Sequence, residues 1–177
     1  MVKKGNIMRK LLLILLILSS SLAHARWTAN STIIPDNSAM KTGEKISAQL
    51  IFTNNFKDFI KDWQKPETPN IIPSEKVTVG EVLSSFIIFS GCIEVNKNCN
   101  VITNYILTYP SGKTTKFDNV SQWKESAGEP GVLRLGRGIL HNKIEESDEK
   151  GTYTLSAEVI DLNGGEKLLL KKNYEVY

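Results

Sequence analysis

The stretch that decides the fold is residues 151–161, which read GTYTLSAEVID. Its apolar residues stand at every second position, and polar residues fill the positions between them: Tyr153, Leu155, Ala157 and Val159. Successive side chains of a β-strand point to opposite faces of the sheet, so this two-residue period places the four on one face. The stretch predicts a strand with one buried and one solvent-facing side.

The chain on either side of this strand alternates between short apolar segments and turns. Gly, Pro and Asn mark turns at residues 79–81, 110–113, 150–151 and 163–165. The segments between them predict strands at residues 76–79, 82–90, 100–109, 114–120, 132–135, 139–144, 152–161 and 167–176. Strands at a spacing of ~10 residues favour an antiparallel β-sandwich over parallel βαβ units. We therefore expect a mostly β chain.

Tyr153 favours the immunoglobulin-like version of this sandwich. It follows the turn at Gly151 and begins a late strand. This is the position of a tyrosine corner, in which the phenol hydroxyl bonds to backbone a few residues upstream. The alternative is an ordinary, half-buried strand tyrosine.

One short helix is predicted before these strands. After a strand at residues 45–52, the apolar residues follow the i, i+3, i+4, i+7 spacing of one helix face: Phe56, Phe59, Ile60 and Trp63. Asn55 precedes them as a suitable N-cap. Two helical turns are marginal in water alone, so we expect this helix to dock on the sheet. Residues 65–73 contain three prolines and predict an extended linker.

Residues 1–25 have the three parts of a secretory signal peptide. A basic start is followed by an unbroken apolar run at residues 11–18 and by Ala23-His24-Ala25, a small-x-small cleavage pattern. Met8 is an alternative start, because the segment from Met8 onward is a complete signal by itself. A membrane anchor is disfavoured, since the apolar run is shorter than the ~20 residues that span a bilayer. We expect export to the periplasm, with the extracellular space as the alternative.

The processed chain divides at the linker into two parts. Residues 26–74 would contain the N-terminal strand, the helix and the linker, and residues 75–177 the immunoglobulin-like domain. The leader carries four of the 22 basic residues and none of the 19 acidic ones, so the processed chain has one more acidic than basic side chain. This balance, with no basic stripe, argues against nucleic-acid binding. No second long apolar run follows, which argues against an integral membrane protein.

Cys92 and Cys99 are the chain's two cysteines. An even count in an exported chain predicts a disulfide, which would close the neck of a hairpin with a polar tip. A redox-active pair usually has the C-x-x-C spacing, which this pair lacks. A zinc site would need two more ligands, and the processed chain has one histidine, so we expect no metal and no cofactor.

No catalytic motif is present. His141 is the one histidine left for a general base, and its place in a predicted strand favours a solvent-facing or locally paired ring. An acidic run precedes the turn at Gly151: Glu145, Glu146, Asp148 and Glu149. Paired carboxylates serve glycosidases, but adjacent acids in a loop usually form a solvated turn. We assign no catalytic residues and keep a hydrolase as the last alternative.

The candidate binding residues are aromatic and polar side chains near loops, where we expect them to be exposed. Trp123 is followed by a polar loop, and Trp63 ends the predicted helix. Tryptophan is enriched at interface hot spots, although each of the two could instead serve packing. Asn96 and Lys97 lie in the polar tip between the cysteines.

Several short motifs resemble a set of uncharacterised bacterial exported proteins with an immunoglobulin-like domain. These are residues 59–66 (FIKDWQKP), 89–92 (FSGC), 99–101 (CNV), 110–113 (PSGK), 151–153 (GTY) and 157–161 (AEVID). A weaker similarity, carried by PSGK and GTY, links the chain to macroglobulin-type domains. The resemblance implies a periplasmic β-sandwich and transfers no site residues.

The leading hypothesis is a non-enzymatic periplasmic accessory module that recognises another envelope protein. The tip between the cysteines, the loop after Trp123 and the edge strands are the candidate contact elements. The alternative is a domain that binds carbohydrate or envelope glycan through Trp123.

Overall fold

The computed structural model describes residues 27–29, 32–66 and 71–177. The predicted signal peptide lies outside these residues. Two five-stranded sheets make up most of the described chain, together with the helix α2 (Phe56–Trp63) and a small hairpin of β1 (Thr28–Ala29) and β2 (Thr32–Ile33). The prediction of a mostly β chain with one short helix is therefore confirmed for the described residues.

The first sheet has the strand order β10-β6-β4-β3, and β9 pairs with the other half of β6. Its strands are β10 (Leu140–Lys143), β6 (Val82–Ser90), β4 (Ser47–Thr53), β3 (Met40–Thr42) and β9 (Arg134–Leu135). β4 comes from the segment before the linker and pairs along its length with β6, from the segment after it. This sheet is thus built from both sides of the linker.

The second sheet has the strand order β5-β12-β11-β7-β8. Its strands are β5 (Lys76–Val77), β12 (Lys167–Val176), β11 (Gly151–Asp161), β7 (Val101–Thr108) and β8 (Thr114–Trp123). β5 pairs parallel to β12, whereas the other pairs of this sheet are antiparallel. The expectation of a purely antiparallel fold is corrected at this one pair. The turn at residues 78–81 leads from β5 into β6, which belongs to the other sheet. β5 therefore forms no hairpin with the strand that follows it and pairs instead with β12, the last strand of the chain.

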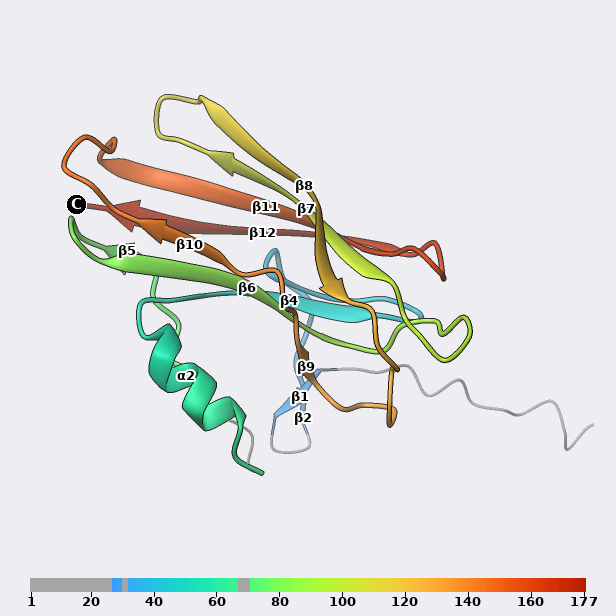
Figure 1. Cartoon of the computed structure of the whole chain (residues 1–177). Coiled ribbons are helices and arrows are strands. Elements are labelled where there is room, and N and C mark those ends of the chain that lie inside the picture. The colour runs from blue at the N-terminus through green and yellow to red at the C-terminus, as the bar shows by residue number, and fades with distance from the viewer. Residues whose placement is uncertain (1–26, 30–31, 67–70) are drawn as a thin grey trace, which may run out of the picture.

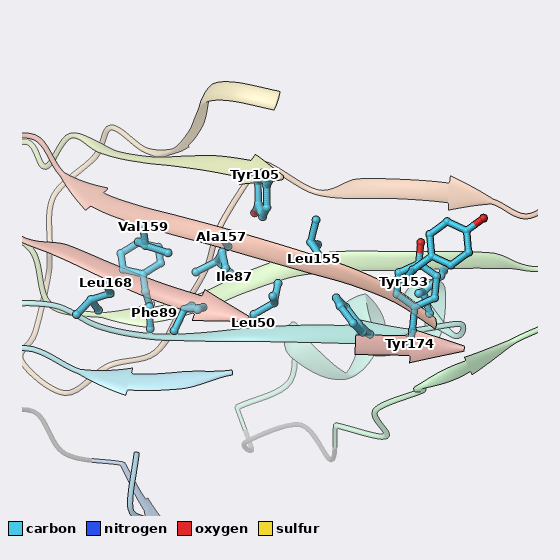
Figure 2. Close-up of a cluster of buried hydrophobic side chains, with 14 of the residues drawn as sticks. Leu50, Ile87, Phe89, Tyr105, Tyr153, Leu155, Ala157, Val159, Leu168 and Tyr174 are labelled. Carbon is cyan, nitrogen blue, oxygen red and sulfur yellow. The ribbon is translucent and has the colours of Figure 1, made fainter. Parts of the chain in front are cut away.

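The two sheets lie one above the other, with a shared apolar core between them (Figure 1). Figure 2 shows side chains of both sheets meeting there: Leu50, Ile87 and Phe89 from the first sheet, and Tyr105, Leu155, Ala157, Val159, Leu168 and Tyr174 from the second. Tyr153, Leu155, Ala157 and Val159 are each at most 2% exposed. The alternation that predicted one buried face of this strand is therefore confirmed.

The predicted helix is α2, and it packs on the outer face of the first sheet (Figure 1). Phe59 stacks on Phe86 of β6, with ring centroids 4.7 Å apart. Because α2 covers one face of β6 and the core covers the other, β6 is buried on both sides from its second residue onward. Asn55 occupies the N-cap position but makes no side-chain capping bond.

The tyrosine corner is present. The Tyr153 hydroxyl donates a hydrogen bond to the carbonyl oxygen of Glu149 over 2.8 Å. Gly151 lies between them with a φ of 124°, a conformation that L residues rarely adopt. The glycine turn and the tyrosine together tie the start of β11 to the preceding loop.

β8 continues three residues beyond the predicted end at Val120 and ends at Trp123. A β-bulge interrupts the register opposite Thr103 and Tyr105, and Asn119 has a φ of 56°. A bulge shifts the side-chain alternation by one residue while pairing goes on. The sequence pattern therefore stops before the strand does.

Candidate binding surface at the disulfide hairpin

Cys92 and Cys99 form the predicted disulfide, with their Cα atoms 5.9 Å apart. We call residues 92–99 the disulfide hairpin. Inside it Val95 and Asn98 exchange two backbone hydrogen bonds, of 2.9 and 3.1 Å. Asn96 and Lys97 are left as a two-residue turn at the tip, and both are exposed.

Both tip residues have left-handed backbones, with φ of 52° for Asn96 and 63° for Lys97. Positive φ at both central residues is the pattern of a type I′ hairpin turn, for which Asn-Gly is the preferred sequence. Asn tolerates this conformation, whereas lysine at the second position costs about 1 kcal/mol relative to glycine. Lys97 is thus an exposed residue in a left-handed backbone conformation that lysine disfavours.

The turn between β11 and β12 holds the disulfide hairpin from one side. Asp161 is fully buried, and its carboxylate accepts a hydrogen bond from the backbone N–H of Ile93 over 2.7 Å. The side-chain amide of Asn163 donates to the carbonyl oxygens of Ile93 and Asn98, each over 2.9 Å. These bonds fix both arms of the hairpin on the end of the second sheet.

The loop after β8 holds the disulfide hairpin from another side. We call residues 124–133 the Trp123 loop. The Glu94 carboxylate accepts hydrogen bonds from the Ser126 hydroxyl over 2.7 Å and from the Ala127 N–H over 2.5 Å. These two bonds, the hydroxyl first, lower the pKa of Glu94 below its usual range. The N–H of Cys99 also donates to the carbonyl oxygen of Glu125 over 2.9 Å.

Trp123 is half-buried at the end of β8, beside the disulfide hairpin. Its ring lies edge-on to Phe89 of the core at 6.1 Å, and its indole N–H donates to the carbonyl oxygen of Ser126 over 3.0 Å. The guanidinium groups of Arg134 and Arg137 lie 5.7 and 5.2 Å from its ring centroid. Cation–π contacts of this kind occupy the ring surface that a sugar would stack on.

The four candidate residues do not form one site. Asn96, Lys97 and Trp123 lie on connected elements at one end of the two sheets, joined through the Glu94 contacts. Trp63 lies in α2, where its ring packs on Phe59 at 5.6 Å, in a cluster on the outer face of the first sheet. It belongs to the helix layer and not to the disulfide hairpin.

Three residues that support the hairpin were missed in the sequence. Glu94, Asp161 and Asn163 are far from their partners along the chain, and no local pattern pairs them. The sequence indicated two of them only weakly. Asp161 ends a strand and Asn163 precedes a pair of glycines, which are positions where turn residues are expected. Val95, which is 53% exposed at the tip, was also missed.

The residues considered for catalysis lie apart from one another. The Nδ1 atom of His141 is 2.9 Å from the hydroxyl of Ser84, and its ring lies against Phe56 at 5.2 Å. Ser84 is 2% exposed, so this serine–histidine pair offers no accessible nucleophile. The carboxylate of Glu149, from the acidic run, instead bonds the N–H and hydroxyl of Ser111, each over 2.7 Å.

Within residues 27–29, 32–66 and 71–177, no three His, Cys, Asp or Glu side chains gather as a metal-binding group would. Over the same part of the chain, no helix has the length and apolar character needed to cross a bilayer.

Comparison with known proteins gives no family for this chain. No family model matches it, and no curated protein matches it significantly. Solved structures resemble it loosely. An alkylpurine DNA glycosylase from Pseudomonas fluorescens is 13% identical with a TM-score of 0.43; the match covers 75% of this chain and 30% of the glycosylase chain.

Immunoglobulin-like domains are among the similar structures. An immunoglobulin-like protein from Pseudomonas aeruginosa is 18% identical with a TM-score of 0.31, and the match covers 64% of this chain and 86% of that one. A CARDB domain from Pyrococcus furiosus, in complex with di-metal ions, is 10% identical with a TM-score of 0.40; coverage is 81% of this chain and 99% of that one. At such identities and TM-scores these matches carry no argument about function.

Proposed function

We propose that this protein is an exported, non-enzymatic accessory module with an immunoglobulin-like β-sandwich, which recognises another envelope protein through its disulfide hairpin. The periplasm is the proposed compartment. The single observation that carries the proposal is the tip itself, where Lys97 is exposed in a left-handed conformation that glycine would adopt more easily. Strained backbone that the surroundings hold in place is a common feature of recognition sites.

The contacts that hold the disulfide hairpin in place favour recognition of a partner surface with a defined shape. The disulfide closes the neck, Asp161 and Asn163 hold both arms, and Glu94 joins the tip to the Trp123 loop. A loop that is already ordered loses little conformational entropy on binding. An exposed apolar residue, Val95, beside one cation suits a protein surface that offers an apolar pocket next to a carboxylate.

The immunoglobulin-like assignment and the export assignment rest on separate features. Two face-to-face sheets and the Tyr153–Glu149 bond support the fold type. The disulfide supports an oxidising compartment, because such bonds persist in the periplasm and outside the cell and are rare in the cytosol. The leader-like sequence of residues 1–25 points the same way.

The glycan alternative has less support. Sugar-binding tryptophans present an open ring face, whereas two guanidinium groups lie against the ring of Trp123. Arg137 is itself paired with Glu125 over 2.6 Å, which holds it beside the loop. A protein partner therefore remains the proposal.

The test is affinity capture from periplasmic extract with the processed chain as bait. Lys97→Glu reverses the charge at the tip and, because neither residue is glycine, leaves the backbone strain unchanged. Lys116→Glu makes the same charge change at an exposed position of β8, away from the hairpin. We expect a protein that is captured by the native chain and by Lys116→Glu but lost with Lys97→Glu.

Binding should then be measured with the purified partner. A loss of at least tenfold in affinity for Lys97→Glu, with Lys116→Glu unchanged, would support the hairpin as the contact surface. Equal capture by all three baits, or no captured protein at all, would count against it.

A further inference from the structure

A pocket of about 220 Å³ opens between the two sheets on the side where β10 and β8 are edge strands. Its lining is mostly apolar and comes from both sheets: Leu107, Phe117, Leu140, Leu155, Tyr109 and Tyr174. None of the described residues that line the pocket belongs to the disulfide hairpin or to the Trp123 loop. The pocket is therefore separate from the proposed protein-binding surface.

Polar contacts join the two sheets around this pocket. The side-chain oxygen of Gln122 in β8 accepts a hydrogen bond over 3.2 Å from the N–H of Gly138, which precedes β10 in the chain. Asn142 of β10 donates a hydrogen bond to the Tyr174 hydroxyl of β12 over 3.1 Å, and both residues line the pocket. Leu107 and Leu140 stay partly exposed although they pack on the core. Apolar surface left open to water costs about 25 cal/mol per Å², which an apolar ligand would recover.

One polar side chain in the pocket has no partner. Ser85 lies on the inward side of β6 opposite Leu140, is 5% exposed, and lines the pocket. Within the described part of the chain its hydroxyl makes no hydrogen bond. The Ser85 hydroxyl is not among the fully buried polar atoms of the described residues that lack a partner, which are those of Ser90 and Thr103. It is therefore open to the pocket, where it can bond a water or a polar ligand atom.

The charge and size of the pocket define the ligand. Among the described residues, no Lys, Arg, Asp or Glu lines it. Of its other polar side chains, Asn142 is bonded to the Tyr174 hydroxyl, and the ring of His141 is bonded to Ser84 and lies against Phe56 of the helix. An ionic group would lose its hydration without compensation there. An apolar cavity of ~150 Å³ is known to hold benzene, so 220 Å³ suits one ring with a polar substituent. The rings of Tyr109, Phe117 and Tyr174 offer edges and faces for aromatic contact.

We propose that this inter-sheet pocket binds a small neutral aromatic molecule, whose single ring packs between Leu107 and Leu140 and whose hydroxyl or carbonyl group bonds to Ser85. The ligand class follows from the pocket alone and does not depend on the disulfide hairpin. Phenol, toluene and benzoate are suitable probes, because they share one ring and differ in the polar or charged group.

The test is titration of the ¹⁵N-labelled processed chain, followed by backbone amide chemical shifts. Phenol should give saturable shifts centred on Ser85, Leu140 and Leu155. Toluene should bind about 2- to 10-fold more weakly, as expected for the loss of one hydrogen bond. Benzoate should bind at least 10-fold more weakly than phenol. Unsaturable shifts, shifts centred elsewhere, or equal binding of benzoate and phenol would overturn the proposal.

Variants test the assigned contacts. Ser85→Ala should remove the advantage of phenol over toluene, and Leu140→Phe should fill the pocket and abolish binding of both. Ile106→Phe adds a similar volume on the opposite, outer face of β7 and should leave binding unchanged. If Leu140→Phe lacks the dispersed spectrum of the native fold, Leu107→Phe fills the same pocket from the other sheet. Retained binding in a folded, pocket-filled variant would contradict the assigned site.

Discussion

The carboxylate of Glu166 lies 2.8 Å from the backbone nitrogen of Lys45, a residue 121 positions earlier in the chain. It also accepts hydrogen bonds from the N–H groups of Glu44 over 2.6 Å and Ile46 over 3.1 Å. Three consecutive N–H groups thus converge on one side chain. This contact joins the turn before β4, in the first sheet, to the turn before β12, in the second.

Replacing Glu166 should destabilise the fold. Glu166→Ala leaves three N–H groups without their charged acceptor, and we expect a loss of about 2 kcal/mol in the free energy of unfolding. Urea denaturation followed by circular dichroism measures it. Glu129→Ala, at an exposed loop position, is the matched control and should change stability by less than about 0.5 kcal/mol. A loss no larger than that of the control would show that the contact contributes little.

A side chain at Gly43 should also destabilise the fold, because it would collide with the Glu166 carboxylate. A Cβ atom there would lie 2.2 Å from Oε1 of Glu166 and 2.6 Å from the carbonyl oxygen of Ile46. Gly43→Ala should therefore disturb the Glu166 contact, and its cost should be smaller in the Glu166→Ala background than in the native chain. A double-mutant cycle of urea midpoints checks this, and simple additivity would argue against a shared contact.

Reduction of the disulfide should weaken the fold without abolishing it. The bridge closes a short loop, and the chain-entropy model gives about 2.5 kcal/mol for it. Intact mass spectrometry should show the native chain lighter than the reduced one by two hydrogen atoms. Urea denaturation with and without reductant then measures the stability. A Cys92→Ala, Cys99→Ala double variant should match the reduced chain and be insensitive to reductant.

Lys97→Gly should stabilise the protein while removing a proposed contact. Glycine adopts the φ of 63° without steric cost, so the gain should be about 1 kcal/mol. Lys116→Gly, in the middle of β8, should instead destabilise by about 0.5–1 kcal/mol. Thermal and urea unfolding distinguish the two. A destabilised Lys97→Gly would mean that the lysine side chain supports the turn.

Alkaline pH should destabilise this protein more than it would a protein whose tyrosines are all exposed to solvent. Burial raises the pKa of Tyr105, Tyr153 and Tyr174 above the ordinary value of 10.0. The unfolded chain ionises first, so the stabilising effect of these phenols is complete below about pH 10 and is lost as pH rises through their folded pKa values. Urea midpoints measured across this range should fall, and less steeply for Tyr174→Phe. Parallel slopes for the two proteins would contradict the assignment.

Local patterns predicted the regular elements well. The strand at residues 167–176 and the helix face from Phe56 to Trp63 have the bounds that their periodicity indicates. Both signals are complete within one element, because burial of one face repeats every two or 3.6 residues. Short elements such as β3, with three residues, are too brief to show a period and were missed.

The candidate site was less accessible to sequence reasoning. The cysteine pair and the polar tip were visible, because an even cysteine count and turn residues are local features. The bonds that hold the hairpin join Ile93 to Asp161 and Glu94 to Ala127. Single side chains at such separations leave no repeating pattern, so nothing in one sequence pairs them.

By itself, the sequence determined that the described chain is mostly β, where most strands and the helix lie, which face of β11 is buried, and which cysteines join. Tertiary structure alone decided that β4 and β6 pair across the linker, that β5 runs parallel to β12, and that Glu166 closes the turn at Lys45. The physical reason is the distance along the chain over which each kind of information acts. Periodicity records which face of an element meets an apolar core, whereas the choice of neighbour depends on packing and hydrogen bonds between residues far apart in the chain.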